Sequence, residues 1–167
     1  MARNTGPGAP TPVEFNGLKF LIINNPAQAT LTQFIKELKK YNAKIVARCC
    51  EPTYSTEPLA QEGIKVVDFC IDDGAVPDNQ IIRDWLDLVA QTFSHDSEAC
   101  IAVHCIAGLG RAPVLVAIAL IENGMKYHAA VEFIRARRRG AINQKQLEFL
   151  EKYKPMNKKG KESCSVM

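Results

Sequence analysis

The sequence lacks any apolar stretch that approaches the roughly 18 residues of a transmembrane helix. Its N-terminus has no apolar signal core, so we expect no secretory signal peptide. No spacing of Cys and His resembles a zinc site, and we expect no metal and no other cofactor. No aromatic residue stands among the lysines of residues 154–167, which argues against a nucleic-acid partner. What remains is 167 residues with 47% hydrophobic content, which suits one globular domain.

The chain divides into three expected parts. Residues 1–12 are rich in Gly, Pro and Thr and are expected to form a flexible N-terminal arm. The globular domain is expected over residues 13–155, followed by a basic tail over residues 156–167. Six cysteines without a secretory signal predict reduced thiols in the cytosol rather than a disulfide framework.

The basic residues gather near the C-terminus. Residues 135–167 hold 10 basic and 3 acidic residues, a balance of +7, whereas residues 1–134 hold 11 and 15, a balance of −4. The last four residues, Cys-Ser-Val-Met, have the form of a prenylation box, with Cys164 as the acceptor of a farnesyl group; the alternative is a stray cysteine in a tail. The lysines upstream supply the second signal that one prenyl chain needs. We therefore expect the protein at the cytoplasmic face of the plasma membrane and endosomes, with some in the cytosol or nucleus when Cys164 is unprenylated.

Apolar runs of strand length alternate with helical periodicities along the chain. The uniformly apolar residues 100–103 are typical of a central parallel strand, and Thr30 stands at the start of a capping-box spacing. The expected strands cover residues 18–23, 44–49, 64–69 and 100–103, and the expected helices begin near residues 30, 78, 113, 126 and 143. This pattern predicts an α/β fold with a central, mostly parallel sheet flanked by helices.

The most informative segment follows the strand at residues 100–103 and opens a helix. It reads His-Cys-Ile-Ala-Gly-Leu-Gly-Arg, from His104 to Arg111, with five residues between Cys105 and Arg111. In such a strand–loop–helix, successive N–H groups turn inward and the helix dipole adds positive potential, which makes an anion site. The expected phosphate-binding residues are Ile106, Ala107, Gly108, Leu109, Gly110 and Arg111.

A cysteine at the base of an anion-binding loop should exist largely as thiolate, and a thiolate held against a phosphate is a phosphoryl-accepting nucleophile. The planar guanidinium of Arg111 can clamp two phosphate oxygens. The segment therefore predicts a cysteine-dependent phosphatase, although Cys and Arg at this spacing also occur by chance.

Asp72 and Asp73 lie on a loop with Gly and Pro that follows the strand expected at residues 64–69. The leaving group of a phosphomonoester departs as an alkoxide or phenolate, and a carboxylic acid within reach can supply its proton. The same two residues could instead be turn residues or the cap of the next helix. The residues alone leave this choice open.

These pieces together resemble the phosphatases of regenerating liver, the prenylated type IVA branch of the dual-specificity protein tyrosine phosphatases. The resemblance runs from about Val13 to Tyr153 and resumes at the C-terminal box. The matching pieces are residues 37–41 (Glu-Leu-Lys-Lys-Tyr), 50–54 (Cys-Glu-Pro-Thr-Tyr), 72–75 (Asp-Asp-Gly-Ala), 104–113 and 138–141 (Arg-Arg-Gly-Ala). The resemblance implies a dual-specificity protein-tyrosine-phosphatase fold.

The resemblance also implies roles for particular residues. Cys105 would be the nucleophile, Arg111 the phosphate clamp and Asp73 the general acid, with Asp72 assisting. His104 is expected to be structural, its imidazole hydrogen-bonding nearby backbone and helping to hold the thiolate form.

The resemblance assigns Cys50 as the partner of Cys105 in a reversible disulfide, which fits a redox switch. This chain also carries Cys49, which alternation along the strand would send to the opposite face. It departs from the family at residues 69–71, Phe-Cys-Ile, where the familiar members carry Trp-Pro ahead of a Phe. That departure bears on the stiffness and closure of the acid loop.

Ala112 stands where most dual-specificity phosphatases carry Ser or Thr, and the missing hydroxyl predicts slow turnover. It also favours an alternative, a binding module that engages the cystathionine-β-synthase-pair domains of magnesium transport mediators. In that interpretation, which the family resemblance supplies, Arg139 is a contact and Cys105 lies inside the interface. Sulfur transfer by a rhodanese-like loop is disfavoured by the Arg spacing and the acid loop. The substrate could be a phosphoprotein or a phosphoinositide, and membrane anchoring could promote a homo-oligomer.

Overall fold

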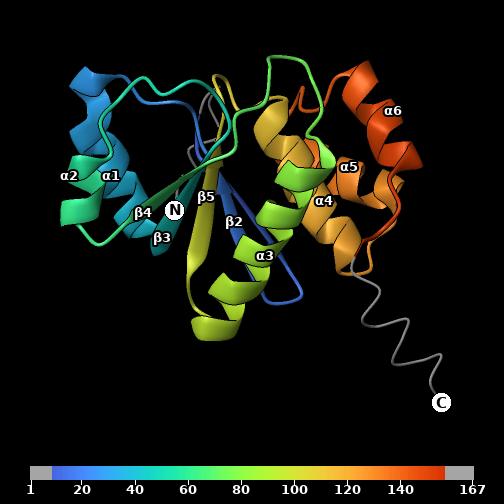
Figure 1. Cartoon of the computed structure of the whole chain (residues 1–167), viewed down its shortest axis with the longest axis horizontal. Coiled ribbons are helices and arrows are strands. Elements are labelled where there is room, and N and C mark those ends of the chain that lie inside the picture. Colours follow the sequence, from blue (N-terminus) through green and yellow to red (C-terminus); the bar gives the residue numbers. More distant parts are fainter. Residues whose placement is uncertain (1–8, 157–167) are drawn as a thin grey trace.

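The computed structural model describes residues 9–156 of the chain. Within this range a five-stranded sheet has the order β1-β2-β5-β3-β4 (Figure 1). The strands are β1 (Thr11–Phe15), β2 (Leu18–Ile22), β3 (Ala43–Arg48), β4 (Lys65–Asp68) and β5 (Cys100–His104). β1 pairs antiparallel with β2, and the other three pairings are parallel. The mostly parallel α/β sheet expected from the sequence is confirmed.

Helices cover both faces of the sheet. One face carries α1 (Leu31–Lys40) and the short α2 (Glu57–Gln61), which was not among the expected helices; the other carries the remaining four (Figure 1). Those four are α3 (Asn79–His95), α4 (Arg111–Glu122), α5 (Tyr127–Arg137) and α6 (Gln144–Lys152). α4 is buried on all sides from residue 111 to residue 121, because it packs between the sheet and the neighbouring helices.

Side chains of the sheet divide between two cores because successive residues of a strand point to opposite faces. On β5, Ile101 and Val103 join the core beneath α3 to α6. Cys100 and Ala102 join the core beneath α1 and α2. β5 is therefore buried on both sides, which explains its uniformly apolar sequence.

Strand β1 takes in Thr11 and Pro12, which their composition assigns to the N-terminal arm. Asn16 and Gly17 both adopt positive φ angles, 51° and 85°, and turn β1 back onto β2. Asn-Gly between two strands is the sequence signal of such a tight hairpin. The strand therefore begins two residues before Val13.

Two expected helix starts are confirmed by their caps. The Asp78 carboxylate accepts a hydrogen bond from the first turn of α3, and the Asn143 side chain does the same for α6. The capping box expected at Thr30 is wrong. Thr30 ends the short 3₁₀ helix η1 (Gln28–Thr30), where its hydroxyl accepts from the Ala27 N–H at 3.0 Å, so α1 begins without a side-chain cap.

The parallel strands place their ends together. β3, β4 and β5 end at Arg48, Asp68 and His104, and the segments that follow them lie at the edge of the sheet drawn uppermost in Figure 1. This is the edge at which ligands bind in open α/β sheets.

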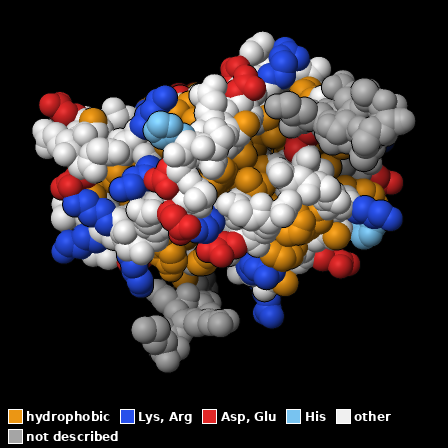
Figure 2. Space-filling view, turned by 90° about the horizontal axis from the view of Figure 1, so that it is seen from below, with side chains coloured by type: hydrophobic (Ala, Val, Ile, Leu, Met, Phe, Trp, Pro, Cys, Tyr) orange, Lys and Arg blue, Asp and Glu red, His pale blue; other side chains and the backbone are white. Residues whose placement is uncertain are grey.

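The opposite end of the molecule faces the viewer in Figure 2, where basic and acidic side chains are interspersed around apolar ones. No helix within residues 9–156 is long and apolar enough to cross a membrane.

Candidate active site

The loop from Cys105 to Gly110, called the phosphate loop below, links the end of β5 to the start of α4. Cys105 is 3% exposed and lies at the base of the loop, in the core beneath α4. Arg111 is the first residue of α4, so the helix N-terminus and its unpaired N–H groups point at this loop. The structure thus brings the expected nucleophile, the expected clamp and a helix N-terminus to one place.

The carbonyl groups of residues 106–109, in the middle of this loop, face outward. They accept hydrogen bonds from Asn25, Arg138 and Ile142, which lie on other segments. In a trans peptide the N–H points opposite to the carbonyl, so the N–H groups of residues 107–110 are turned to the inner side of the loop. That arrangement is a cradle for an anion.

Arg138 holds the middle of the loop, and the sequence analysis did not identify it. The side chain is buried, and its Nε donates to the Gly108 carbonyl at 2.7 Å while Nη2 donates to the Ala107 carbonyl at 2.9 Å. Its other hydrogen bonds go to the Ala9 carbonyl, the Thr11 hydroxyl and the Asn24 amide oxygen.

All five of these Arg138 hydrogen bonds go to neutral oxygens, so the charge of the guanidinium contributes to the positive potential of the loop. Burial lowers the pKa of Arg138, but a guanidinium remains protonated at any ordinary pH. Gly108 has a φ of 69°, and a Cβ there would lie 2.5 Å from Arg138 Nη2. A glycine is therefore required at residue 108 on two counts.

The sequence did contain a signal for Arg138. Val131 and Ile134 are buried on the inner face of α5, and Arg138 follows them at the helical spacing i, i+3, i+7. The neighbouring Arg137 and Arg139 are exposed. Of the three consecutive arginines, the hydrophobic periodicity selects the middle one as the buried one.

Arg111 connects the phosphate loop to the acid loop, residues 69–77. Its side chain is 7% exposed, its Nη1 donates to the Ile71 carbonyl at 2.9 Å, and its Nη2 lies 3.5 Å from Asp73 Oδ1. The Asp73 side chain is 95% exposed. The expected clamp and the expected acid therefore meet, and the acid is free to turn towards a bound substrate.

The acid loop is anchored at both ends without the Trp-Pro of the family. Phe69 and Ile71 are buried, and the Phe69 ring packs edge-on against Trp85 at 5.9 Å. At the far end, the fully buried Gln146 donates to the Ala75 carbonyl at 3.3 Å. The structure places Gln146 between the two loops, because a Cβ on Gly110 would lie 3.0 Å from its amide nitrogen.

Asp72 is exposed, and its carbonyl accepts from the Ala75 N–H at 2.9 Å in the turn that contains Gly74. Of the two neighbouring carboxylates, only Asp73 forms an ion pair with Arg111 within the described residues. This geometry favours Asp73 over Asp72 as the acid.

His104 lies beneath the loop as a neutral imidazole. Burial lowers its pKa to about 4. Its Nδ1 lies 3.1 Å from the Cys105 carbonyl and its Nε2 lies 2.7 Å from the Tyr54 hydroxyl. A neutral imidazole has one donor and one acceptor, so Nδ1–H donates to the carbonyl and Nε2 accepts from Tyr54. His104 therefore supports the Cys105 backbone by hydrogen bonding and adds no charge.

Tyr54 is held in turn by an ion pair. Arg48 lies over the Tyr54 ring at 4.9 Å and donates to the Tyr54 carbonyl at 3.2 Å. The same guanidinium binds both oxygens of Asp68, at 2.5 and 3.1 Å. Burial raises the pKa of Tyr54, which keeps its hydroxyl available as a donor to His104.

Cys49 and Cys50 follow β3 at the same edge. The buried Cys50 Sγ lies 4.0 Å from His104 Nδ1. Cys49 is fully buried in the same core as Cys105, and its pKa is raised by burial and by the neighbouring Cys105 and Cys50 thiols. The expectation that strand alternation takes Cys49 away from Cys105 is therefore wrong, because both cysteines lie in the same core.

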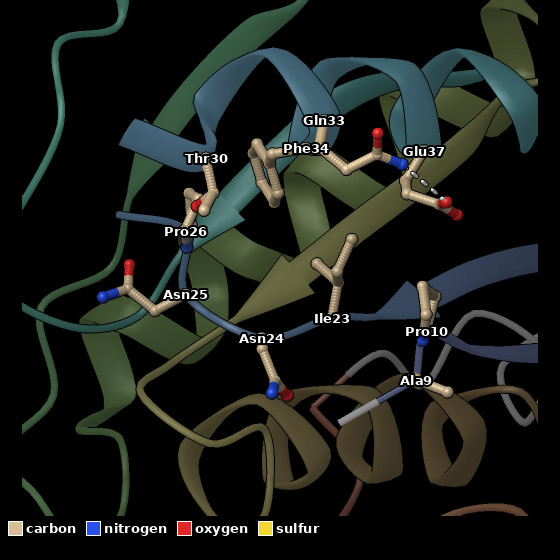
Figure 3. A pocket seen from close by; sticks show the side chains of 10 residues that line it. All are labelled: Ala9, Pro10, Ile23, Asn24, Asn25, Pro26, Thr30, Gln33, Phe34 and Glu37. Carbon is tan, nitrogen blue, oxygen red and sulfur yellow. Dashed lines mark hydrogen bonds between the residues drawn. The ribbon is translucent and has the colours of Figure 1, made fainter. Parts of the chain in front are cut away.

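A groove of ≈ 410 Å³ borders the phosphate loop (Figure 3). It runs between α1 and the segment after β2, whose Asn25 N–H donates to the Ile106 carbonyl at 3.2 Å. Glu37 is the one charged residue among the described residues that line it, and its carboxylate accepts a hydrogen bond from Gln33. The lining residues are Ala9, Pro10, Ile23, Asn24, Asn25, Pro26, Thr30, Gln33, Phe34 and Glu37.

One further expected site residue, Arg139, lies within the described residues. Arg139 is exposed, next to the buried Arg138. Cys164 and the lysines at positions 158, 159 and 161 lie outside the described residues. Within residues 9–156, no cluster of His, Cys, Asp and Glu could hold a metal ion.

Comparison with known proteins agrees with this geometry. The family model described as "Polymorphic toxin system, DSP-PTPase phosphatase" matches residues 23–125. The solved structure of a protein tyrosine phosphatase from Leishmania major superposes with a TM-score of 0.80 at 36% identity, covering 87% of this chain and 98% of that one.

Two curated relatives match over most of their length. Protein tyrosine phosphatase type IVA 3 of Homo sapiens is 57% identical over 155 residues, which are 93% of this chain and 89% of that protein. PRL-1 phosphatase of Drosophila melanogaster is 53% identical over 163 residues, which are 95% and 93% of the two chains. The chain accordingly belongs to the protein tyrosine phosphatase type IVA family and is a cysteine-dependent protein tyrosine phosphatase with a dual-specificity phosphatase fold.

Proposed function

We propose that Cys105 attacks a phosphomonoester and forms a cysteinyl-phosphate. The observation that carries this assignment is the inward turn of the loop N–H groups above Cys105, with Arg111 at the rim. The phosphate oxygens would bind those N–H groups and the Arg111 guanidinium, as Asp73 protonates the departing oxygen. Water then attacks phosphorus, the S–P bond breaks, and the Cys105 thiolate is released.

A single-turnover assay of the wild type and Cys105→Ser tests this assignment, and a pulldown with the same two proteins tests partner binding separately. Cys105→Ser should abolish product formation and the acid-stable phosphoenzyme, because a serine here lacks the thiolate. Product formation by Cys105→Ser at the wild-type rate would overturn the assignment.

Turnover should be slow because Ala112 offers no donor to the departing thiolate. Ala112 is fully buried as the second residue of α4, adjacent to the phosphate clamp. A hydroxyl at this position would stabilise the leaving thiolate by about 1–3 kcal/mol. We therefore expect phosphoenzyme to accumulate in the wild type.

A phosphoprotein is favoured over a phosphoinositide as the substrate. Among residues 9–156, the side chains that line the groove beside the phosphate loop include the Glu37 carboxylate and no basic group. A carboxylate repels the additional phosphates of a phosphoinositide head, whereas an extended peptide can lie in such a groove. Comparing turnover of a phosphotyrosine peptide with that of a soluble phosphoinositide tests this preference, and equal specificity constants would contradict it.

A reversible disulfide between Cys50 and Cys105 is proposed as the redox switch. Cys50 Sγ lies 4.0 Å from the imidazole of His104, the residue that precedes the nucleophile. Mild peroxide should block labelling of Cys105 by a thiol reagent until a reductant is added. Cys50→Ser should leave Cys105 open to irreversible overoxidation, so that the reductant no longer restores labelling. Peptide mapping that pairs Cys105 with Cys49 would contradict the choice of Cys50.

Membrane attachment is proposed to need both the prenyl group on Cys164 and the lysines before it. Cys164→Ser should move the protein from the plasma membrane and endosomes to the cytosol and nucleus. Neutralising Lys158, Lys159 and Lys161 should weaken attachment without abolishing prenylation. Full membrane retention of Cys164→Ser would refute the prenyl anchor.

A second candidate function is a binding module for the cystathionine-β-synthase-pair domain of a magnesium transport mediator. Ile106 and Leu109 are 54% and 41% exposed on the phosphate loop, and Arg139 is exposed nearby. Apolar side chains around a slow active site suit a protein interface. Arg139→Glu should abolish capture of that domain while leaving the single-turnover rate unchanged. The capture assay, run beside gel filtration, would also show whether the chain forms a homo-oligomer.

A further inference from the structure

Cys70 is an exposed thiol at the start of the acid loop. Its Sγ lies 4.0 Å from the Cys50 carbonyl oxygen and 3.7 Å from Glu51 Oε1. It stands within residues 69–71, where the sequence departs from the family pattern, so the phosphatase chemistry leaves this thiol unexplained.

The backbone carries the acid loop alongside the end of β3. The Phe69 N–H donates to the Arg48 carbonyl at 2.8 Å, and the Ile71 N–H donates to the Cys49 carbonyl at 3.4 Å. Segments paired in this way lie about 4.8 Å apart, which falls within the Cα separations of about 4.4–6.8 Å found in disulfides. A Cys50–Cys70 bond therefore fits the backbone.

Cys50 lies between the segment that carries Cys105 and the segment that carries Cys70. Its Sγ lies 4.0 Å from His104 Nδ1, which contacts the Cys105 carbonyl, and its own carbonyl lies beside the Cys70 thiol. We propose that Cys70 is a second disulfide partner of Cys50. By thiol–disulfide exchange, Cys70 replaces Cys105 as the residue to which Cys50 is bonded. This inference rests on the redox switch proposed above.

The exchange needs no oxidant beyond the peroxide that starts the switch. Peroxide converts the Cys105 thiolate to a sulfenic acid, and the Cys50 thiol condenses with it to a disulfide and water. The Cys70 thiolate then attacks Cys50 Sγ, the Cys50–Cys105 bond breaks, and Cys105 leaves as a thiolate. The two oxidising equivalents now reside in the Cys50–Cys70 bond.

The exchange has a consequence for the enzyme. Cys105 is returned as a free thiolate, while the acid loop is bonded to the end of β3 three residues before Asp73. The nucleophile can then again accept a phosphoryl group, while the bond restricts the movement of the loop that carries Asp73. Because Cys70 is exposed, an external thiol can reduce this bond from the surface.

Glu51 provides a graded test of the exchange. The pKa of Cys70 is raised by burial and by the adjacent Glu51 carboxylate. Glu51→Gln should therefore raise the thiolate fraction at neutral pH and speed the exchange several-fold. A merely structural role for Cys70 would leave this rate unchanged.

Cleavage after Lys and Arg separates the three thiols. Residues 49–65 carry Cys49 and Cys50, residues 66–83 carry Cys70, and residues 84–111 carry Cys100 and Cys105. After a peroxide pulse and acid quench, we expect a link between the 49–65 and 84–111 peptides first, replaced by a link between 49–65 and 66–83. Cys70→Ser should leave only the first link, and Cys100→Ala, the matched control, should leave both.

Every other result shows which of the two proposals, the Cys70 exchange or the Cys50–Cys105 switch, is wrong. If only the 49–65 to 84–111 link forms in the wild type, the role of Cys70 is overturned and the Cys50–Cys105 switch stands. If the 66–83 link forms equally in Cys105→Ser, the exchange route is overturned. If neither link forms, both proposals are overturned, and fragmentation that places the 66–83 link on Cys49 overturns the choice of Cys50.

Discussion

The phosphate loop and the acid loop meet at one edge of the sheet but are held differently. The phosphate loop is fixed along its whole length, with Arg138 beneath its centre and His104 at its base. The acid loop is fixed at its ends, while the Asp73 side chain between them is 95% exposed. A nucleophile that must meet phosphorus in line gains from rigidity, whereas an acid that must follow a leaving group gains from freedom.

Removing the Arg138 hydrogen bonds that hold the phosphate loop should have the largest effect on stability and activity. Arg138→Met leaves the buried oxygen of Gly108 and the part-buried oxygens of Ala107 and Asn24 without this donor. We expect the free energy of unfolding to fall by about 3 kcal/mol, and kcat/KM of the folded fraction to fall on the order of 10²-fold. Urea unfolding and steady-state kinetics measure the two effects.

Arg139→Met is the matched control, because it removes an exposed arginine one residue away and should change neither quantity. Unchanged kcat/KM in folded Arg138→Met would show that the loop keeps its shape without Arg138.

The contribution of His104, at the base of the phosphate loop, to the free energy of unfolding should depend on pH. His104 has a folded pKa of about 4, whereas an unfolded histidine titrates near 6.5, so between these values the unfolded state binds more protons. The free energy of unfolding should therefore rise by about 3 kcal/mol from pH 4 to pH 6.5 through this residue. Chemical unfolding across this range measures the slope. His104→Gln should flatten it, and a slope that persists in that variant would refute this source.

Removing the acid should affect rate and not stability. Asp73→Asn should lower kcat/KM, which reports the first phosphoryl transfer, on the order of 10²-fold for a phosphotyrosine peptide, and less for a nitrophenyl phosphate, whose leaving group needs little protonation. Because the side chain is exposed, the unfolding midpoint should stay constant. Asp72→Asn is the matched comparison; a larger loss there would transfer the acid role to Asp72.

The smallest expected effect concerns Ala112, next to the clamp. Ala112→Ser should raise steady-state turnover several-fold, because its hydroxyl donates to the departing thiolate. The first phosphoryl transfer should be unaffected. Rapid mixing with a chromogenic phosphate separates an initial burst from the steady phase, and an unchanged steady phase would show that release of the thiolate does not limit the rate.

The meeting of Cys105 and Arg111 at one loop was predictable because both residues lie in one contiguous segment between a strand and a helix. The strands were predictable because their apolar runs are short and bounded. Arg138 and Gln146 were missed because their partners in the two loops lie 30 and 71 residues away in the chain. A sequence pattern can place such a side chain on a buried face, but it does not say which carbonyl it meets.

The anchoring of the acid loop was likewise not predictable from residue spacing. Its departure from Trp-Pro left its stiffness open, and the burial of Phe69 against Trp85 supplies the anchor. At Thr30 the expected cap failed because the preceding η1 turn uses the hydroxyl locally. Local competition of this kind does not show in residue spacing.

The reach of Arg138 to Ala9 and Thr11 makes the N-terminus part of the catalytic apparatus. A truncated protein designed to start at Val13 would keep every residue of the phosphate loop and still lose two of the acceptors that orient the guanidinium beneath it. A bulky fusion partner placed directly before Ala9 would press on the same contact. Truncations and tags at this end of the chain are therefore active-site perturbations, and kinetic comparisons between such preparations need a shared N-terminus.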